Sequence, residues 1–110
     1  MKVSELVFDK KHPVKETLSQ QACRELADQL PDWSVTEADG IPQLVAEFSF
    51  KDFAEALAFT NAIGELAEKY NHHPAITTEY GRVTVRWWTH TAGGIANNDF
   101  VLARETSRAV

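Results

Sequence analysis

Three of the four histidines in the chain stand where imidazole chemistry could take place. His72 and His73 are adjacent, and His90 follows after a run of alternating residues. Imidazoles titrate near neutral pH, so two of them beside one ligand can both donate and accept protons. Glu68 lies four residues before His72, and in a continuous helix its carboxylate would share a face with that imidazole and orient it. This cluster predicts general acid/base catalysis.

Three other interpretations of these residues remain open. Adjacent histidines at a helix end can cap carbonyl groups and interact with the helix dipole. Zinc could bind His72, His73, His90 and a carboxylate, although neighbouring side chains diverge and the familiar ligand spacings are absent. Nucleophilic catalysis has the weakest support, because Cys23 lies in an apolar helical stripe and no serine stands in a nucleophile elbow. We therefore expect neither a metal nor a redox cofactor.

Helical spacing of apolar residues predicts a first helix over residues 18–30 and a closing helix over residues 97–108. Thr17 or Ser19 is available as the N-cap of the first helix. Asp99 falls in the first turn of the closing helix, where an acid stabilises the positive end of the dipole. This ordinary role is the one we expect for Asp99.

A long central helix should position Glu68 and the first two histidines. Asp52 followed by Glu55 resembles a capping box and predicts the start of this helix. The helix should end near Asn71, because Pro74 disfavours helical geometry in the residue before it.

Alternating residues predict that a strand carries the third histidine. Residues 76–80 and 83–87 alternate around Gly81-Arg82, which suits a two-residue turn. If the second strand continues, Trp88 and His90 lie on the face opposite Val83, Val85 and Trp87, away from the core.

The order of elements predicts an α+β fold. Residues 33–35 and 44–50 form another hairpin with its turn at Ala38-Asp39-Gly40, so the chain reads helix, hairpin, helix, hairpin, helix. We expect a four-stranded antiparallel sheet with three helices packed on one face. Arg86 and Trp88, on the opposite face, could meet a ligand or a second subunit.

Length and composition indicate one folded domain. The 110 residues are 44% hydrophobic, which is enough for a core. We assign residues 17–110 to the domain and residues 1–16 to an N-terminal arm, which should contain a turn at His12-Pro13.

The net charge of −5 and the lack of basic runs argue against direct nucleic-acid binding. A single cysteine excludes an internal disulfide, and no segment looks like a secretory signal or a membrane span. We expect a soluble cytoplasmic protein.

The ordered set of chemical residues resembles the pterin-4a-carbinolamine dehydratases, also known as the dimerization cofactor of a homeodomain transcription factor. The resemblance extends from about Leu18 to Ala103 and leaves the N-terminal arm uncovered. Its signature is carried by Glu68, His72-His73-Pro74, Tyr80, His90 and Asp99, with further similarity at Leu30-Pro31-Asp32-Trp33 and Phe50-Lys51-Asp52-Phe53.

The resemblance implies dehydration of 4a-hydroxytetrahydropterin to quinonoid dihydropterin, the step that recycles pterin after aromatic amino-acid hydroxylation. It makes His72 and His90 the acid/base pair, with Glu68 orienting the cluster. The residues implied to bind the substrate are Asn71, His73, Pro74, Trp88, Thr89 and Thr91.

The resemblance also implies partners. They are the pterin itself, a second copy in a homodimer or homotetramer, and an aromatic amino-acid hydroxylase. The alternative function is a non-catalytic dimerization cofactor, in effect a binding module for a transcription factor.

The chain departs from the family pattern at three positions. Asn71 stands where the family often has Asp, Trp88 where it usually has a small residue, and Ala96 where Thr commonly caps the last helix. We expect the Trp88 indole to stack on the flat pterin ring.

Overall fold

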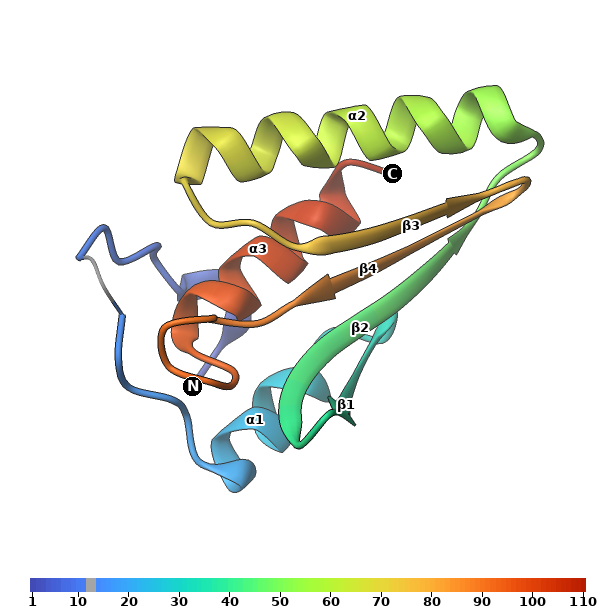
Figure 1. Cartoon of the computed structure of the whole chain (residues 1–110). Coiled ribbons are helices and arrows are strands. Elements are labelled where there is room, and N and C mark those ends of the chain that lie inside the picture. Colours follow the sequence, from blue (N-terminus) through green and yellow to red (C-terminus); the bar gives the residue numbers. More distant parts are fainter. Residues whose placement is uncertain (12–13) are drawn as a thin grey trace.

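The chain runs through helix, hairpin, helix, hairpin, helix (Figure 1), which confirms the predicted α+β class. The structure is a computed structural model and describes residues 1–11 and 14–110, so the turn predicted at His12-Pro13 lies outside the described residues. A short 3₁₀ helix, absent from the sequence-based expectation, comes first. The elements are η1 Val3–Glu5, α1 Gln20–Ala27, β1 Trp33–Ala38, β2 Ile41–Ser49, α2 Phe53–Tyr70, β3 Ala75–Glu79, β4 Arg82–Trp87 and α3 Asn97–Arg108.

The two hairpins join into one antiparallel sheet with strand order β1-β2-β4-β3. Leu44 of β2 pairs with Trp87 of β4, and this register aligns the apolar residues of both strands on one face. On that face six side chains are buried, as the alternation predicts: Leu44, Ala46, Phe48, Val83, Val85 and Trp87. A slip of one residue would turn all of them to the other face, so burial fixes the register.

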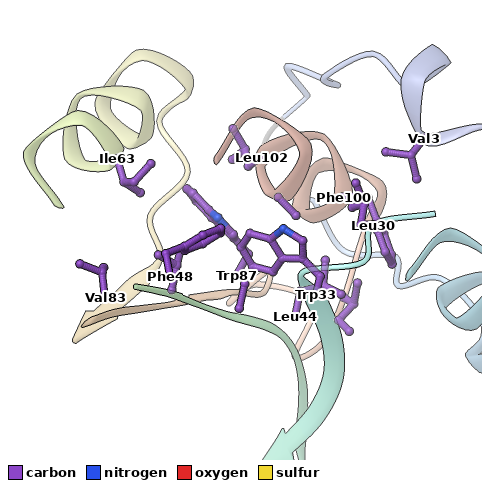
Figure 2. Packing of buried hydrophobic residues seen from close by; sticks show 14 of the residues in the cluster. Val3, Leu30, Trp33, Leu44, Phe48, Ile63, Val83, Trp87, Phe100 and Leu102 are labelled. Carbon is purple, nitrogen blue, oxygen red and sulfur yellow. The ribbon is translucent and has the colours of Figure 1, made fainter. Parts of the chain in front are cut away.

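The helices cover this apolar face, and the core lies between the two layers (Figure 2). Figure 2 shows the rings of Trp33, Phe48 and Trp87 grouped beside Phe100 and Leu102 of α3. Burying rings of this size against helices is the main source of stability in such a layered domain. Within the described residues, no helix is both long and apolar enough to cross a bilayer.

Two buried indoles fix α3 over the sheet. The Nε1–H of Trp87 donates to Thr106 Oγ1 at 2.9 Å, and the Nε1–H of Trp33 donates to Ser107 Oγ at 2.8 Å. A buried indole N–H needs such an acceptor, because leaving it unpaired costs about 1–3 kcal/mol. These bonds set the position of α3 and therefore of Asp99 in its first turn.

Local boundaries differ from the prediction in three places. In the first hairpin the strands are longer than residues 33–35 and 44–50, since β1 runs to Ala38 and β2 starts at Ile41, which leaves a turn of Asp39-Gly40. The first helix is shorter than residues 18–30: it starts at Gln20, where the Ser19 hydroxyl accepts from the Ala22 N–H, and it already ends at Ala27. The second turn is Tyr80-Gly81, not Gly81-Arg82: the positive φ of 76° falls on Gly81, while Arg82 already pairs with Glu79.

The predicted cap of α2 is present and can be tested by stability. The Asp52 carboxylate accepts from the Glu55 N–H at 2.9 Å, so Asp52→Ala leaves that donor without its partner. We expect the variant to unfold about 1 kcal/mol more easily in urea, the usual cost of losing an N-cap. Asp52→Asn, which keeps an acceptor, is the control and should unfold like the parent chain. Equal stability of the alanine variant would show that the cap contributes nothing.

Candidate active site

The end of α2 separates the two adjacent histidines. The helix stops at Tyr70, and Asn71 adopts the left-handed conformation with φ 49° and ψ 45°. Asparagine tolerates this conformation better than most residues, and a left-handed residue is a common way to end a helix. After the bend, His72 is only 8% exposed, whereas His73 remains on the surface.

The predicted pairing of Glu68 with His72 is wrong. Glu68 Oε2 lies 2.5 Å from Nε2 of His73, and both side chains are exposed. The prediction assumed that the helix continues to residue 72, but after the left-handed residue the spacing of four no longer places the two side chains on one face.

His72 instead pairs with a buried carboxylate. Its Nε2 lies 2.7 Å from Asp99 Oδ1, and Asp99 is fully buried. The Trp87 ring lies nearly parallel to the imidazole, with centroids 5.8 Å apart and an interplanar angle of 14°. The imidazole of His72 is therefore held both at one nitrogen and against one ring face.

Asp99 also accepts two further hydrogen bonds. Its Oδ2 accepts from the Thr89 hydroxyl and from the Ala96 N–H, both at 2.8 Å. The bond to Ala96 agrees with the role expected for Asp99, which is to stabilise the start of the last helix. It binds a backbone N–H at this terminus, where the Ala96 side chain itself cannot form a capping hydrogen bond. Pattern reasoning missed the pairing with His72, because no local spacing links residues 27 positions apart.

His90 lies just beyond the strand that was expected to carry it. β4 ends at Trp87, and Thr89 then pairs with Gly94 across a tight turn, so the expected continuous strand through residue 90 is wrong. His90 is exposed and stacks on Trp88, with centroids 4.4 Å apart and an angle of 25°. Because the Asp99 carboxylate binds both Thr89 and His72, it connects the segment that carries His90 to the segment that carries His72.

We call the place where Asp99 binds both His72 and Thr89, with the adjacent His73 and His90, the histidine junction. The other residues of the expected set lie as follows. Pro74 is half-buried next to His73, Asn71 is exposed, and the Thr91 hydroxyl donates to the Val14 carbonyl. Tyr80 is 76% exposed, in the turn at the other end of the second hairpin. A hollow of about 520 Å³ between α1, the first hairpin and residues 92–95 is lined by none of the histidines.

The alternative chemistries find little support in the described part of the chain. Over residues 1–11 and 14–110, no three His, Cys, Asp or Glu side chains gather as metal ligands would. Cys23 is buried, and that burial, followed by the nearby negative charge of Asp99, raises the pKa of its thiol. A thiol with a raised pKa is a poor nucleophile, as expected of a structural cysteine.

Comparison with known proteins gives the family. The model of the family described as pterin 4 alpha carbinolamine dehydratase matches residues 16–109. A protein of Chlorobium limicola named "Putative pterin-4-alpha-carbinolamine dehydratase" is 56% identical over 81 residues, which cover 74% of this chain and 72% of the relative. A protein of the same name from Chlorobaculum tepidum is 47% identical over 108 residues, covering 94% of this chain and 97% of the relative.

A solved structure agrees with the sequence relatives. The crystal structure of a "transcriptional coactivator/pterin dehydratase" from Brucella melitensis has a TM-score of 0.77 and 31% identity, covering 86% of this chain and 98% of that one. The matched span contains every residue of the histidine junction. The chain thus belongs to the pterin 4 alpha carbinolamine dehydratase family of hydro-lyases.

Proposed function

We propose that this protein removes water from 4a-hydroxytetrahydropterin by histidine acid/base catalysis, as a step in pterin recycling. The C4a–O bond breaks and the leaving hydroxide takes a proton from one imidazolium. The N5–H proton passes to a neutral imidazole, and the N5=C4a double bond of the quinonoid dihydropterin forms. One proton is supplied and one is removed, so no electrons are exchanged and no redox partner is required.

The observation that carries this proposal is the Asp99 carboxylate at the junction of His72 and Thr89. A carboxylate accepts hydrogen bonds and cannot donate one, so the neutral His72 ring must carry its proton on Nε2. Its Nδ1 then keeps a lone pair, and His72 is suited to accept the N5 proton. We assign the donor of the other proton to His90, which lies one residue beyond Thr89.

The surrounding residues supply recognition in this proposal. His73, held by Glu68 at the surface, would hold the pterin, and Asn71, Pro74, Thr89 and Thr91 would line its site. This arrangement changes the role of Glu68, which acts on the binding histidine and not on His72. A homodimer or homotetramer and an aromatic amino-acid hydroxylase as supplier of the substrate belong to the same proposal.

A direct assay tests this function. The protein is mixed with freshly generated 4a-hydroxytetrahydropterin, and the absorbance of quinonoid dihydropterin is followed against the spontaneous reaction. We expect acceleration proportional to protein concentration and unchanged by EDTA, because proton transfer alone completes the elimination. A rate equal to the spontaneous one would contradict the proposal, and a rate lost with EDTA and restored by metal would contradict the imidazole mechanism.

A binding module is the second candidate function. It is favoured by the similarity to the Brucella melitensis protein, which is described as a transcriptional coactivator as well as a pterin dehydratase. A pure binding module needs no pair of acid and base imidazoles, whereas the proposed elimination uses both. The same assay separates the two, because a module without catalysis leaves the spontaneous rate unchanged.

Trp88 should act through His90. Because its indole stacks on that imidazole, Trp88→Thr frees the ring and should lower kcat by about twofold to tenfold, the equivalent of the ~0.5–1.5 kcal/mol of an aromatic pair. Trp88→Phe keeps a stacking ring and is the matched control. Steady-state kinetics distinguish the alternatives: a rise in KM alone would mean that the indole contacts the pterin, as the sequence suggested, and does not orient His90.

A further inference from the structure

The N-terminal arm, residues 1–16, lies almost wholly outside the span that the family model matches, yet several of its described residues (1–11 and 14–16) contact the rest of the fold. Val3 is 3% exposed and belongs to the core. The Arg104 guanidinium of α3 donates to the carbonyl oxygens of Val3 and Leu6 at 2.9 and 2.8 Å. A charged donor that binds two carbonyl groups fixes the path of the backbone between them.

Asn98 fixes the next part of the arm. Its Oδ1 accepts from the Asp9 N–H at 2.8 Å, and its Nδ2 donates to the Asp9 carbonyl at 2.9 Å. Asn98 is only 2% exposed while Asp9 is exposed, so the two bonds are part-buried, and together they fix the Asp9 backbone at both its N–H and its carbonyl group. The residue before Asp9 is thereby fixed, and the residue after Asn98 is Asp99, the partner of His72.

The fixed residue, Phe8, lies against the proposed proton acceptor. Its ring is tilted on Tyr70 with centroids 4.8 Å apart, and it meets the His72 imidazole nearly edge-on at 6.3 Å and 74°. Trp87 lies parallel to the same imidazole. His72 is therefore restrained by two aromatic rings in addition to the Asp99 carboxylate.

The arm also reaches the other half of the site. The Thr91 hydroxyl, next to His90, donates to the carbonyl oxygen of Val14. Two described residues of the arm therefore contact the segments of the proposed acid/base histidines: the Phe8 ring contacts His72, and the Val14 carbonyl accepts from Thr91 beside His90.

We propose that residues 3–9 of the arm form a wall of the active site and that Phe8 is a positioning residue, which holds His72 in the orientation and tautomer that accept a proton. This inference rests on the proposed function for its kinetic consequence. Its structural content, a dependence of the His72 ring on Phe8, does not require any activity.

Replacement of Phe8 tests the proposal by two readouts. In Phe8→Ala, His72 gains space to rotate away from Asp99, and kcat should fall about tenfold, since small misplacements of a reacting group cost rates of this order or more. The ¹⁵N resonances of the His72 ring should move from the Nε2–H tautomer toward a mixture of tautomers. Phe8→Tyr, which keeps the ring, should retain the parental kcat and resonances. Val7→Ala is the control, because Val7 is the neighbouring arm residue and is 79% exposed.

The outcomes separate this inference from the proposed function. If the parental chain shows no dehydratase activity, the proposed function fails, while the ring resonances still test Phe8. Parental kcat and unchanged resonances in Phe8→Ala would overturn the role of Phe8. Should that variant not fold, as judged by circular dichroism, Phe8→Leu serves in its place, because it fills much of the same volume without a ring.

Discussion

His72→Ala and His90→Ala should each lower the catalysed kcat/KM by about 10²–10⁴, the usual contribution of a positioned acid or base. The two variants remove opposite halves of the same proton exchange, so the double variant should be little worse than either single one. The measurement is the formation of quinonoid dihydropterin above the spontaneous reaction, which sets the lower limit of the detectable range.

His73→Ala is the matched control for these variants. It removes an imidazole from the same segment, but one that pairs with exposed Glu68 and not with Asp99. We expect it to raise KM more than it lowers kcat, because it would lose contact with both the substrate and the transition state. Parental activity in His72→Ala or His90→Ala would remove that residue from the mechanism.

The second large effect is expected from Asp99→Asn. The Thr89 hydroxyl and the Ala96 N–H both donate to Oδ2, so the single amide oxygen of Asn must occupy that position. The amide NH₂ then faces His72, and it can only donate. The Nε2 of His72 must then be unprotonated so that it can accept this hydrogen bond. The proton of the neutral ring moves to Nδ1, which loses the lone pair that would accept the substrate proton. We expect kcat to fall by about 10² or more, the loss of a general base.

This variant should keep its fold. The hydrogen bonds from Thr89 and Ala96 persist, the bond to His72 re-forms with its direction reversed, and the circular dichroism spectrum should remain parental. The ¹⁵N spectrum of His72 should show the Nδ1–H tautomer. Asp52→Asn, which changes an acid at an exposed cap, is the matched control and should have parental kcat. If Asp99→Asn retained activity within about threefold, a range too small for a lost base, the tautomer argument would fail.

The elements of this fold could be predicted because their signals are local. The alternation of Val83, Val85 and Trp87 and the cap at Asp52 act over a few residues, and the structure bears them out. Predictions that extended a local pattern past its end were wrong. The end of the central helix near Asn71 was predicted correctly, but the pairing of Glu68 with His72 required helical geometry through residue 72 and was wrong, and a strand assumed to reach His90 ended at Trp87.

The site itself depends on contacts that no local pattern encodes. His72 and Asp99 are 27 residues apart and meet only after α3 has packed over β4 through the indole of Trp87. The arm is further still from its partners, since Asp9 and Asn98 are separated by 89 residues. Such contacts follow from tertiary packing, and spacing along the chain does not reveal them.

The left-handed backbone at Asn71 bears on how natural variation at this position should be interpreted. With φ at 49°, the site accepts glycine, asparagine and aspartate readily and penalises β-branched side chains. Exchange between Asn and Asp here is therefore compatible with the shape of the chain alone. When orthologues are compared or a library is designed, the residue type at position 71 indicates whether the chain can adopt the left-handed bend after which His72 and His73 point to different surroundings. An aspartate at this position does not by itself show that a protein is catalytically active.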